Sequence, residues 1–61
     1  MSKWKAEVLE QLKKRDRSIA QMARAIRYKP KYIYEVLRME DPPERVRHAI
    51  NVYVGLEELN R

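Results

Sequence analysis

The chain has 61 residues and carries a formal net charge of +5, with 14 lysine or arginine residues, nine aspartate or glutamate residues and no cysteine. A chain of this size buries only about 60% of the surface that it exposes when unfolded, so we expect a single domain over residues 1–61, without room for an enzyme active site closed by a second domain. The absence of cysteine excludes a disulfide framework and a cysteine-based zinc site, and one histidine cannot form a metal site alone. No apolar run approaches the roughly 20 residues that cross a bilayer, and no secretory signal is recognisable, so we expect a soluble, cytoplasmic protein.

The positive charge is concentrated in the middle of the chain. Residues 1–12 carry two lysines and two glutamates, which cancel. Residues 13–38 carry nine lysine or arginine residues against two acids, a local charge of +7, whereas residues 39–61 carry three against five, a local charge of −2. A basic segment is the electrostatic footprint of a nucleic-acid binder when it coincides with a binding motif.

The first predicted helix covers about residues 3–14, with Ser2 or a neighbouring residue as its cap. Apolar residues recur on one of its faces, as in an amphipathic helix. These residues are Trp4, Val8, Leu9 and Leu12. We expect Trp4 to lie in the core. Cations at residues 13–15 fall in the last turn, where they suit the helix dipole and are also placed to contact phosphate.

Two further helices, joined by a short turn, are predicted for residues 18–38. Ser18 and Gln21 have the spacing of a capping box, which starts the first helix at residue 18, and its apolar pattern continues to residue 26. Pro30 is favoured at the first position of a helix, so the second helix runs from Pro30 to about Arg38. Both helices repeat apolar residues three and four positions apart. These are Ile19, Met22, Ala23 and Ile26 in the first helix and Ile33, Val36 and Leu37 in the second.

The last third of the chain predicts a loop, a helix and a terminal turn. Two prolines and an acidic pair mark residues 39–43 as a loop, with Asp41 as a possible cap for a helix from about residue 43 to 54. Gly55 is a natural helix end, and Leu56 and Leu59 form the turn after it. The four segments predict an all-α fold, a compact bundle of four to five short helices. The apolar residues near the end exceed what one small core buries, which predicts a two-fold contact there. They are Val52, Val54, Leu56 and Leu59.

Residues 18–38 resemble the helix-turn-helix of phage repressors and Cro proteins, the XRE-type, lambda-repressor-like family of bacterial regulators. Ala23 stands where that family has a small residue, which lets the second helix cross close by. The family's apolar positions are filled by Met22, Ile26, Tyr28, Ile33 and Val36. The resemblance extends to residues 43–50 and 55–59, which are similar to the family's closing helix and the turn after it, and so covers nearly the whole chain.

The chain departs from the family pattern at three positions. Arg27 occupies the turn position that is usually glycine, so either the turn is mildly strained, by roughly 1 kcal/mol, or it has a different shape. Ile19 stands where glutamine is common. Lys29 stands at the start of the second helix in place of a serine or threonine cap, and lysine is a poor cap.

The resemblance implies that the second motif helix lies in the major groove of DNA and that its N-terminal residues meet base edges. The family's base-reading positions fall on Lys29, Pro30, Lys31, Tyr34 and Glu35, with Arg38 one turn further on. Lysine reads guanine and glutamate accepts from cytosine. Contacts to phosphate are expected from the surrounding basic and hydroxyl side chains. These are Lys13, Lys14, Arg15, Arg17, Ser18, Arg24, Arg27, Tyr32, Arg45 and Arg47. For Tyr32, a role in packing is an equally good expectation as a contact to phosphate.

These features predict a sequence-specific double-stranded DNA-binding transcriptional regulator, a repressor or Cro-like switch of a phage, prophage or mobile element in the bacterial cytoplasm. It would bind operator DNA as a homodimer, formed in solution or only on DNA, with no cofactor, metal, membrane or small-molecule ligand. Two alternatives remain open: a protein-interaction module of the anti-repressor or antitoxin kind, and an architectural or excisionase-type DNA binder. No nucleophile–base pair or phosphate loop points to an enzyme.

Overall fold

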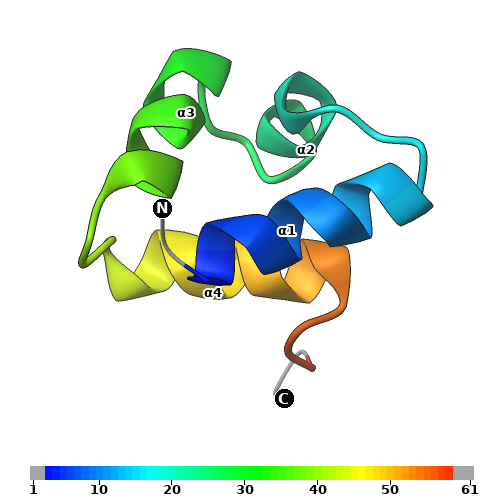
Figure 1. The fold of residues 1–61 in the computed structure, drawn as a ribbon. Coiled ribbons are helices and arrows are strands. Elements are labelled where there is room, and N and C mark those ends of the chain that lie inside the picture. Colours follow the sequence, from blue (N-terminus) through cyan, green and yellow to red (C-terminus); the bar gives the residue numbers. More distant parts are fainter. Residues whose placement is uncertain (1–2, 59–61) are drawn as a thin grey trace.

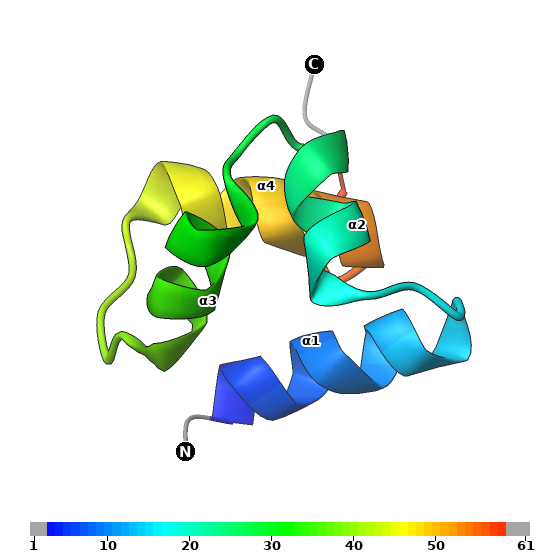
Figure 2. The ribbon, with the colours of Figure 1, turned by 90° about the horizontal axis from the view of Figure 1, so that it is seen from above.

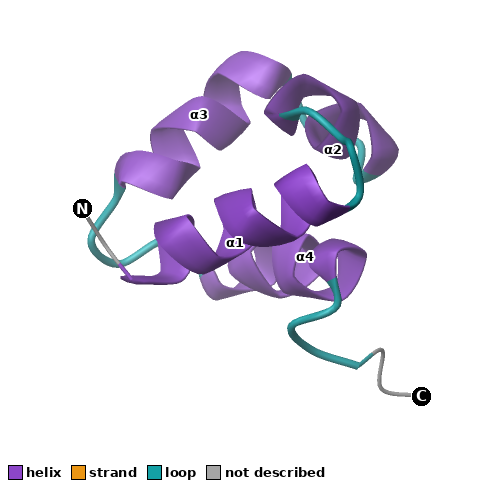
Figure 3. Ribbon diagram, turned by 45° about the vertical axis from the view of Figure 1, so that its right-hand side comes forward, coloured by secondary structure: helices purple, strands orange, loops and turns teal. Residues whose placement is uncertain are grey.

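The structure, a computed structural model, describes residues 3–58 and is entirely helical over that range, with no strand (Figures 1 and 3). The all-α prediction is therefore confirmed. The described part of the chain contains four helices, α1 (Lys3–Lys14), α2 (Ile19–Ala25), α3 (Pro30–Arg38) and α4 (Glu44–Val54). The predicted cap at Ser2 and the predicted packing of Leu59 lie outside the described residues.

The helices form two layers. In Figure 1, α1 and α4 lie side by side in the lower layer, and α2 and α3 lie above them. The view from above, in Figure 2, shows α2 and α3 joined by their short turn, with one end of each helix close to α1. The turn between α2 and α3 is thus at the surface, and α3 presents one side to solvent along its whole length.

Two of the helix starts follow directly from their sequences. Ser18 precedes α2 and its hydroxyl accepts a hydrogen bond from the Gln21 amide (3.1 Å), while the Gln21 side chain accepts one from the Ser18 amide (2.7 Å), so the predicted capping box is confirmed. Pro30 is the first residue of α3, where its missing N–H leaves no carbonyl unpaired. Lys29, before it, makes no capping hydrogen bond.

Three of the helices end in the same way, with one residue in the left-handed conformation. The residues are Asp16 after α1, Arg27 after α2 and Gly55 after α4, with φ of 54°, 68° and 80°. In each case the next amide reaches back five positions, as in the bond from Tyr28 to the Ala23 carbonyl (2.9 Å), which is the Schellman arrangement. The predicted end at Gly55 is confirmed, and Arg27 adopts the left-handed conformation although it is not a glycine.

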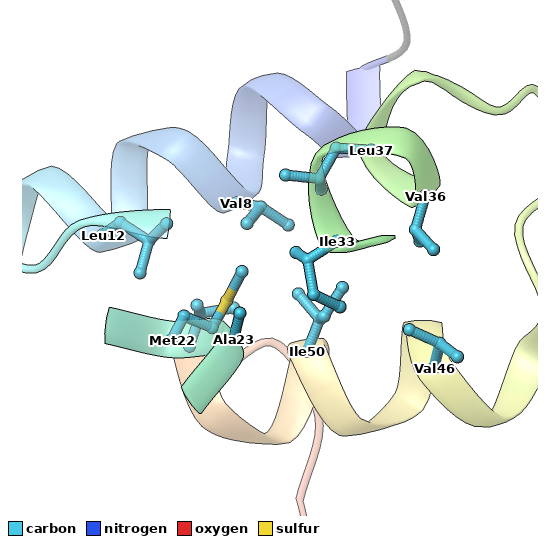
Figure 4. Close-up of a cluster of buried hydrophobic side chains, with 10 residues drawn as sticks. Val8, Leu12, Met22, Ala23, Ile33, Val36, Leu37, Val46 and Ile50 are labelled. Atoms are coloured by element: carbon cyan, nitrogen blue, oxygen red, sulfur yellow. The ribbon is translucent and has the colours of Figure 1, made fainter. Parts of the chain in front are cut away.

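The core lies between the two layers and receives side chains from all four helices (Figure 4). Ten apolar residues are at most 4% exposed: Val8, Leu12, Met22, Ala23, Ile33, Val36, Leu37, Val46, Ile50 and Val54. Trp4, Tyr28, Tyr32 and Leu56 are partly buried and pack against this cluster. Ala23 is fully buried, which agrees with a small residue beneath the crossing of α2 and α3.

One prediction about the last third of the chain is wrong, and a second stays untested. Asp41 does not cap α4, because the helix begins at Glu44 and the cap position is Pro43, which makes no side-chain hydrogen bond. Two consecutive prolines hold the backbone extended before the helix, and this places Asp41 too far away. Of the apolar residues near the end, Val54 is fully buried, Leu56 packs against the core and Val52 is partly buried. The two-fold contact through this end of the domain stays a prediction.

A series of polar side-chain contacts joins the two ends of the described sequence. The Trp4 indole N–H donates to the Asn51 side-chain oxygen (2.6 Å), and the Asn51 amide nitrogen donates to a Glu57 carboxylate oxygen (2.7 Å). The other Glu57 oxygen lies 3.2 Å from His48 Nδ1. Asn51 is the one buried polar residue of the described chain, and these bonds satisfy its side chain.

Candidate nucleic-acid interface

The exposed side of α3 carries three charged residues in one row. Lys31, Glu35 and Arg38 are four and three positions apart, so they lie on one face of the helix, opposite the buried Ile33 and Val36. We call this row the α3 ridge. All three of its residues are exposed, and within residues 3–58 no hydrogen bond or ion pair engages their side chains. The ridge therefore presents two cations and one anion to a partner.

The other predicted base-reading residues lie beside or ahead of the ridge. Lys29 is exposed at the start of α3, and Pro30 is partly buried next to it. Tyr34 is 48% exposed, which agrees with its predicted exposure, and lies on the flank of α3 that faces α1 and the start of α2. Four of the predicted base-reading residues, Lys31, Tyr34, Glu35 and Arg38, therefore form one strip along α3, and Lys29 and Pro30 stand at the start of the helix.

Tyr34 and Arg38 share a surface depression with residues from two other helices. This depression, which we call the hollow, lies between α1, the start of α2 and the last turns of α3. Its lining residues are Lys5, Leu9, Ile19, Tyr34, Leu37 and Arg38.

A second depression brings together three of the predicted phosphate-binding residues. It lies at the start of α2 and is lined by Lys13, Asp16, Arg17, Ser18 and Gln21. Ser18 in this depression and Ile19 in the hollow are adjacent in the chain, so the two depressions are neighbours. The basic residues at the end of α1 therefore continue toward the α3 ridge across the start of α2.

The remaining predicted phosphate contacts are spread over all four helices and the turn between α2 and α3. Arg24 and Arg27 are exposed at the end of α2 and in the turn, and Lys14 is exposed at the end of α1. Tyr32 lies on the other flank of α3, where its ring packs against that of Tyr28 with centroids 5.7 Å apart. Arg45 and Arg47 come from the first turns of α4, in the lower layer of Figure 1, away from the turn between α2 and α3.

Two arginines of the predicted set have partners within the domain. Arg15 donates to the side chain and the carbonyl of Gln11 (2.8 and 3.2 Å), and its guanidinium lies over Gly55, where an added Cβ would be 2.8 Å from it. Arg17 donates to the Tyr53 hydroxyl (3.0 Å). Both side chains therefore tie the first loop to the end of α4.

Sequence reasoning missed three features of this region. Lys5 and Leu9 line the hollow, although Leu9 was predicted only to lie on the apolar face of the first helix and Lys5 had no predicted role. Their spacing of four on α1 was a signal that they share a face. Asp16 adopts a left-handed conformation, which aspartate tolerates better than most residues.

Comparisons with protein-family models, curated proteins and solved structures find no match to this chain. The described helices are all too short and too polar to cross a membrane. Among residues 3–58, no three histidine or acidic side chains come together in a group that could hold a metal ion. A functional assignment for this chain therefore depends on the charge and shape of the surface around α3.

Proposed function

We propose that this chain is a sequence-specific double-stranded DNA-binding regulator that uses α2, the turn and α3 as a helix-turn-helix. The observation that carries the proposal is the coincidence of the +7 segment with an exposed helix whose unpaired charged side chains lie in one row. An α-helix fits the major groove, where lysine or arginine bonds guanine and glutamate accepts from cytosine. Lys31, Glu35 and Arg38 have the chemistry for such reading.

The residues around α3 are suited to hold the DNA backbone. Lys13, Arg17 and Ser18 stand at the start of α2, and Arg24 and Arg27 at its end. Contacts of this kind fix the position of a protein on the duplex without reading its sequence. In a repressor or Cro-like switch of a phage, prophage or mobile element, such binding would occupy an operator in the bacterial cytoplasm and exclude polymerase. A homodimer would read two half-sites about 34 Å apart on one face of the DNA.

Selection of bound sequences from a random duplex library at near-physiological salt tests the proposal. We expect enrichment of a palindromic or repeated motif, with an affinity that falls steeply as salt rises, because bound phosphates release counterions. Enrichment of no sequence would contradict a specific regulator. Retention on neither heparin nor duplex DNA would favour the protein-interaction module, and strong DNA bending with weak sequence preference would favour the excisionase-type role.

A variant test assigns the reading to α3. In the double variant Lys31→Ala, Tyr34→Ala, we expect preference for the selected motif over random DNA to be lost, by about 1–3 kcal/mol for each lost base contact, while non-specific binding persists. Both residues are exposed, so the fold should survive. Lys3→Ala, which removes a cation at the start of α1, serves as the control and should keep the preference. Unchanged specificity in the double variant would place the reading elsewhere.

A further inference from the structure

The hollow beside α3 has an apolar floor that the folding of the domain leaves uncovered. Leu37 at its base is buried, but Leu9 and Ile19 are only partly buried and Tyr34 is 48% exposed. The three uncovered side chains come from three different helices and lie around one depression of about 440 Å³. These partly exposed apolar side chains around one depression leave room for one apolar side chain of a partner to insert.

The composition of the floor favours a protein partner over DNA. Backbone contacts to DNA are made mostly by hydrogen-bonding and charged groups directed at phosphate oxygens. Leu9, Ile19 and Leu37 offer no such group, and a phosphate against them would lose water without gaining a bond. Aliphatic and tyrosine side chains around a depression are instead typical of the centre of a protein–protein interface, where one large side chain of the partner is inserted.

The charged residues at the rim of the hollow favour a partner of negative charge. Lys5 stands on its α1 side and Arg38 on its α3 side, and none of the described residues that line it is acidic. The one acid of α3, Glu35, belongs to the α3 ridge. The neighbouring depression at the start of α2 adds two cations, Lys13 and Arg17, and one acid, Asp16. An occupant with a carboxylate that faces Arg38, next to an apolar side chain, therefore matches the hollow in charge and in polarity.

We propose that the hollow is a docking site for an acidic segment of a protein partner that inserts one large apolar side chain between Leu9, Ile19 and Tyr34. Tyr34 and Arg38 also belong to the strip proposed to read DNA, so a bound segment would cover part of that strip and compete with DNA. This competition rests on the proposed function, whereas the docking itself does not. The domain would then be controlled by a partner that imitates the negative charge of the operator.

Amide chemical shifts of the ¹⁵N-labelled chain, titrated with synthetic peptides, test the docking without DNA. The probe is a peptide of about ten residues with a central phenylalanine flanked by glutamates. Two matched controls replace the phenylalanine with alanine or the glutamates with glutamine. We expect the largest shifts at Leu9, Ile19 and Tyr34, and about tenfold weaker binding for each control peptide, because each lacks one of the two matched features.

Several outcomes would overturn the docking site. If the alanine peptide bound as tightly as the probe, the hollow would not hold an apolar anchor. If the glutamine peptide bound as tightly as the probe, the hollow would not select negative charge. The absence of any shift up to about 2 mM peptide would exclude even a dissociation constant near 1 mM. If the amide shifts of Leu9 and Ile19 changed with the concentration of the chain alone, without peptide, the hollow would instead bind a second copy of the chain. Larger shifts there than at Lys31 on addition of duplex DNA would assign it to DNA.

Two variants separate the docking from the proposed function. Leu9→Asn adds a polar group to the floor and should weaken the peptide about tenfold while leaving DNA affinity within twofold. Lys31→Ala should have the opposite pattern, with weaker DNA binding and unchanged peptide binding. Loss of both ligands in Leu9→Asn, with its circular dichroism unchanged, would make the hollow part of the DNA interface. If the chain bound the peptide but selected no DNA sequence, the docking site would be supported and the proposed DNA-binding function would be contradicted.

Discussion

Arg27 holds a backbone conformation that glycine adopts most easily. Its φ of 68° lies in the left-handed region, where the Cβ of a non-glycine residue is crowded by its own backbone. The Arg27 amide donates to the Arg24 carbonyl (3.1 Å) and the Tyr28 amide to the Ala23 carbonyl (2.9 Å), so the strained residue completes the end of α2. Asp16 has the same role after α1 with less strain, because aspartate tolerates this region. The positive side chain at Arg27 is retained in the turn at a cost in stability.

Replacing Arg27 with glycine should therefore stabilise the domain. We expect Arg27→Gly to raise the free energy of unfolding by about 1 kcal/mol, which corresponds to about 4–8 °C in melting temperature for a domain of this size. Arg27→Ala removes the same charge but keeps the Cβ, so it should bring no comparable gain. Thermal unfolding followed by circular dichroism measures both. Equal stabilisation by alanine and glycine would attribute the effect to charge repulsion in the basic segment instead of backbone strain.

The two helices of the candidate interface begin in opposite ways. α2 has a complete capping box, in which Ser18 and Gln21 satisfy each other's amides. α3 is preceded by Lys29, whose backbone is extended as a cap residue's should be (φ −70°, ψ 136°), but whose side chain bonds none of the first amides. A lysine at this position adds positive charge at the positive end of the helix dipole. Both properties weaken α3 and both increase the attraction of its first turn for an anion.

Lys29→Ser should separate these two effects. Serine would accept from an amide of the first turn and stabilise the domain by about 0.5–1 kcal/mol, while the lost cation should weaken DNA binding and lower its salt dependence by about one phosphate contact. Lys31→Ser, one position inside α3, makes the same charge change without a cap and should give no gain in stability. Melting temperature and salt-dependent DNA affinity measure the pair. A Lys29→Ser variant that gained no stability would show that the cap position is not the weak point of α3.

At the scale of the whole molecule, the parts that sequence predicted are those set by local chemistry. The capping box, Pro30 and Gly55 fix helix boundaries through residues a few positions apart, and the apolar periodicity fixes which faces form the core. The parts that it missed depend on residues distant in the chain. Asn51 is buried because Trp4, 47 positions earlier, and Glu57 satisfy its side chain. The hollow likewise exists only because three helices meet, so the periodicity of α1 alone placed Leu9 on one apolar face with Val8 and Leu12 and did not predict that it lines a depression.

The contacts from Trp4 through Asn51 to Glu57 make the joined ends of the domain sensitive to acid. The hydrogen bond from Asn51, followed by that from His48, holds the pKa of the Glu57 carboxyl below its ordinary value of 4.5. A carboxyl whose pKa is lower in the folded chain stabilises the fold above its unfolded pKa, and this contribution is lost as the pH falls through the folded value.

We therefore expect Glu57→Gln to lower the melting temperature near pH 7 and the difference from the parent chain to shrink as the pH is lowered from about 5 to about 3. Glu58→Gln, one position along and without these bonds, is the control and should change the melting temperature little at either pH. Trp4 is the only tryptophan, so its fluorescence reports on the same contacts, and its emission should change with acid in the parent chain before the helices unfold. A melting-temperature difference that stayed constant across this pH range would mean that Glu57 acts through packing and not through its charge.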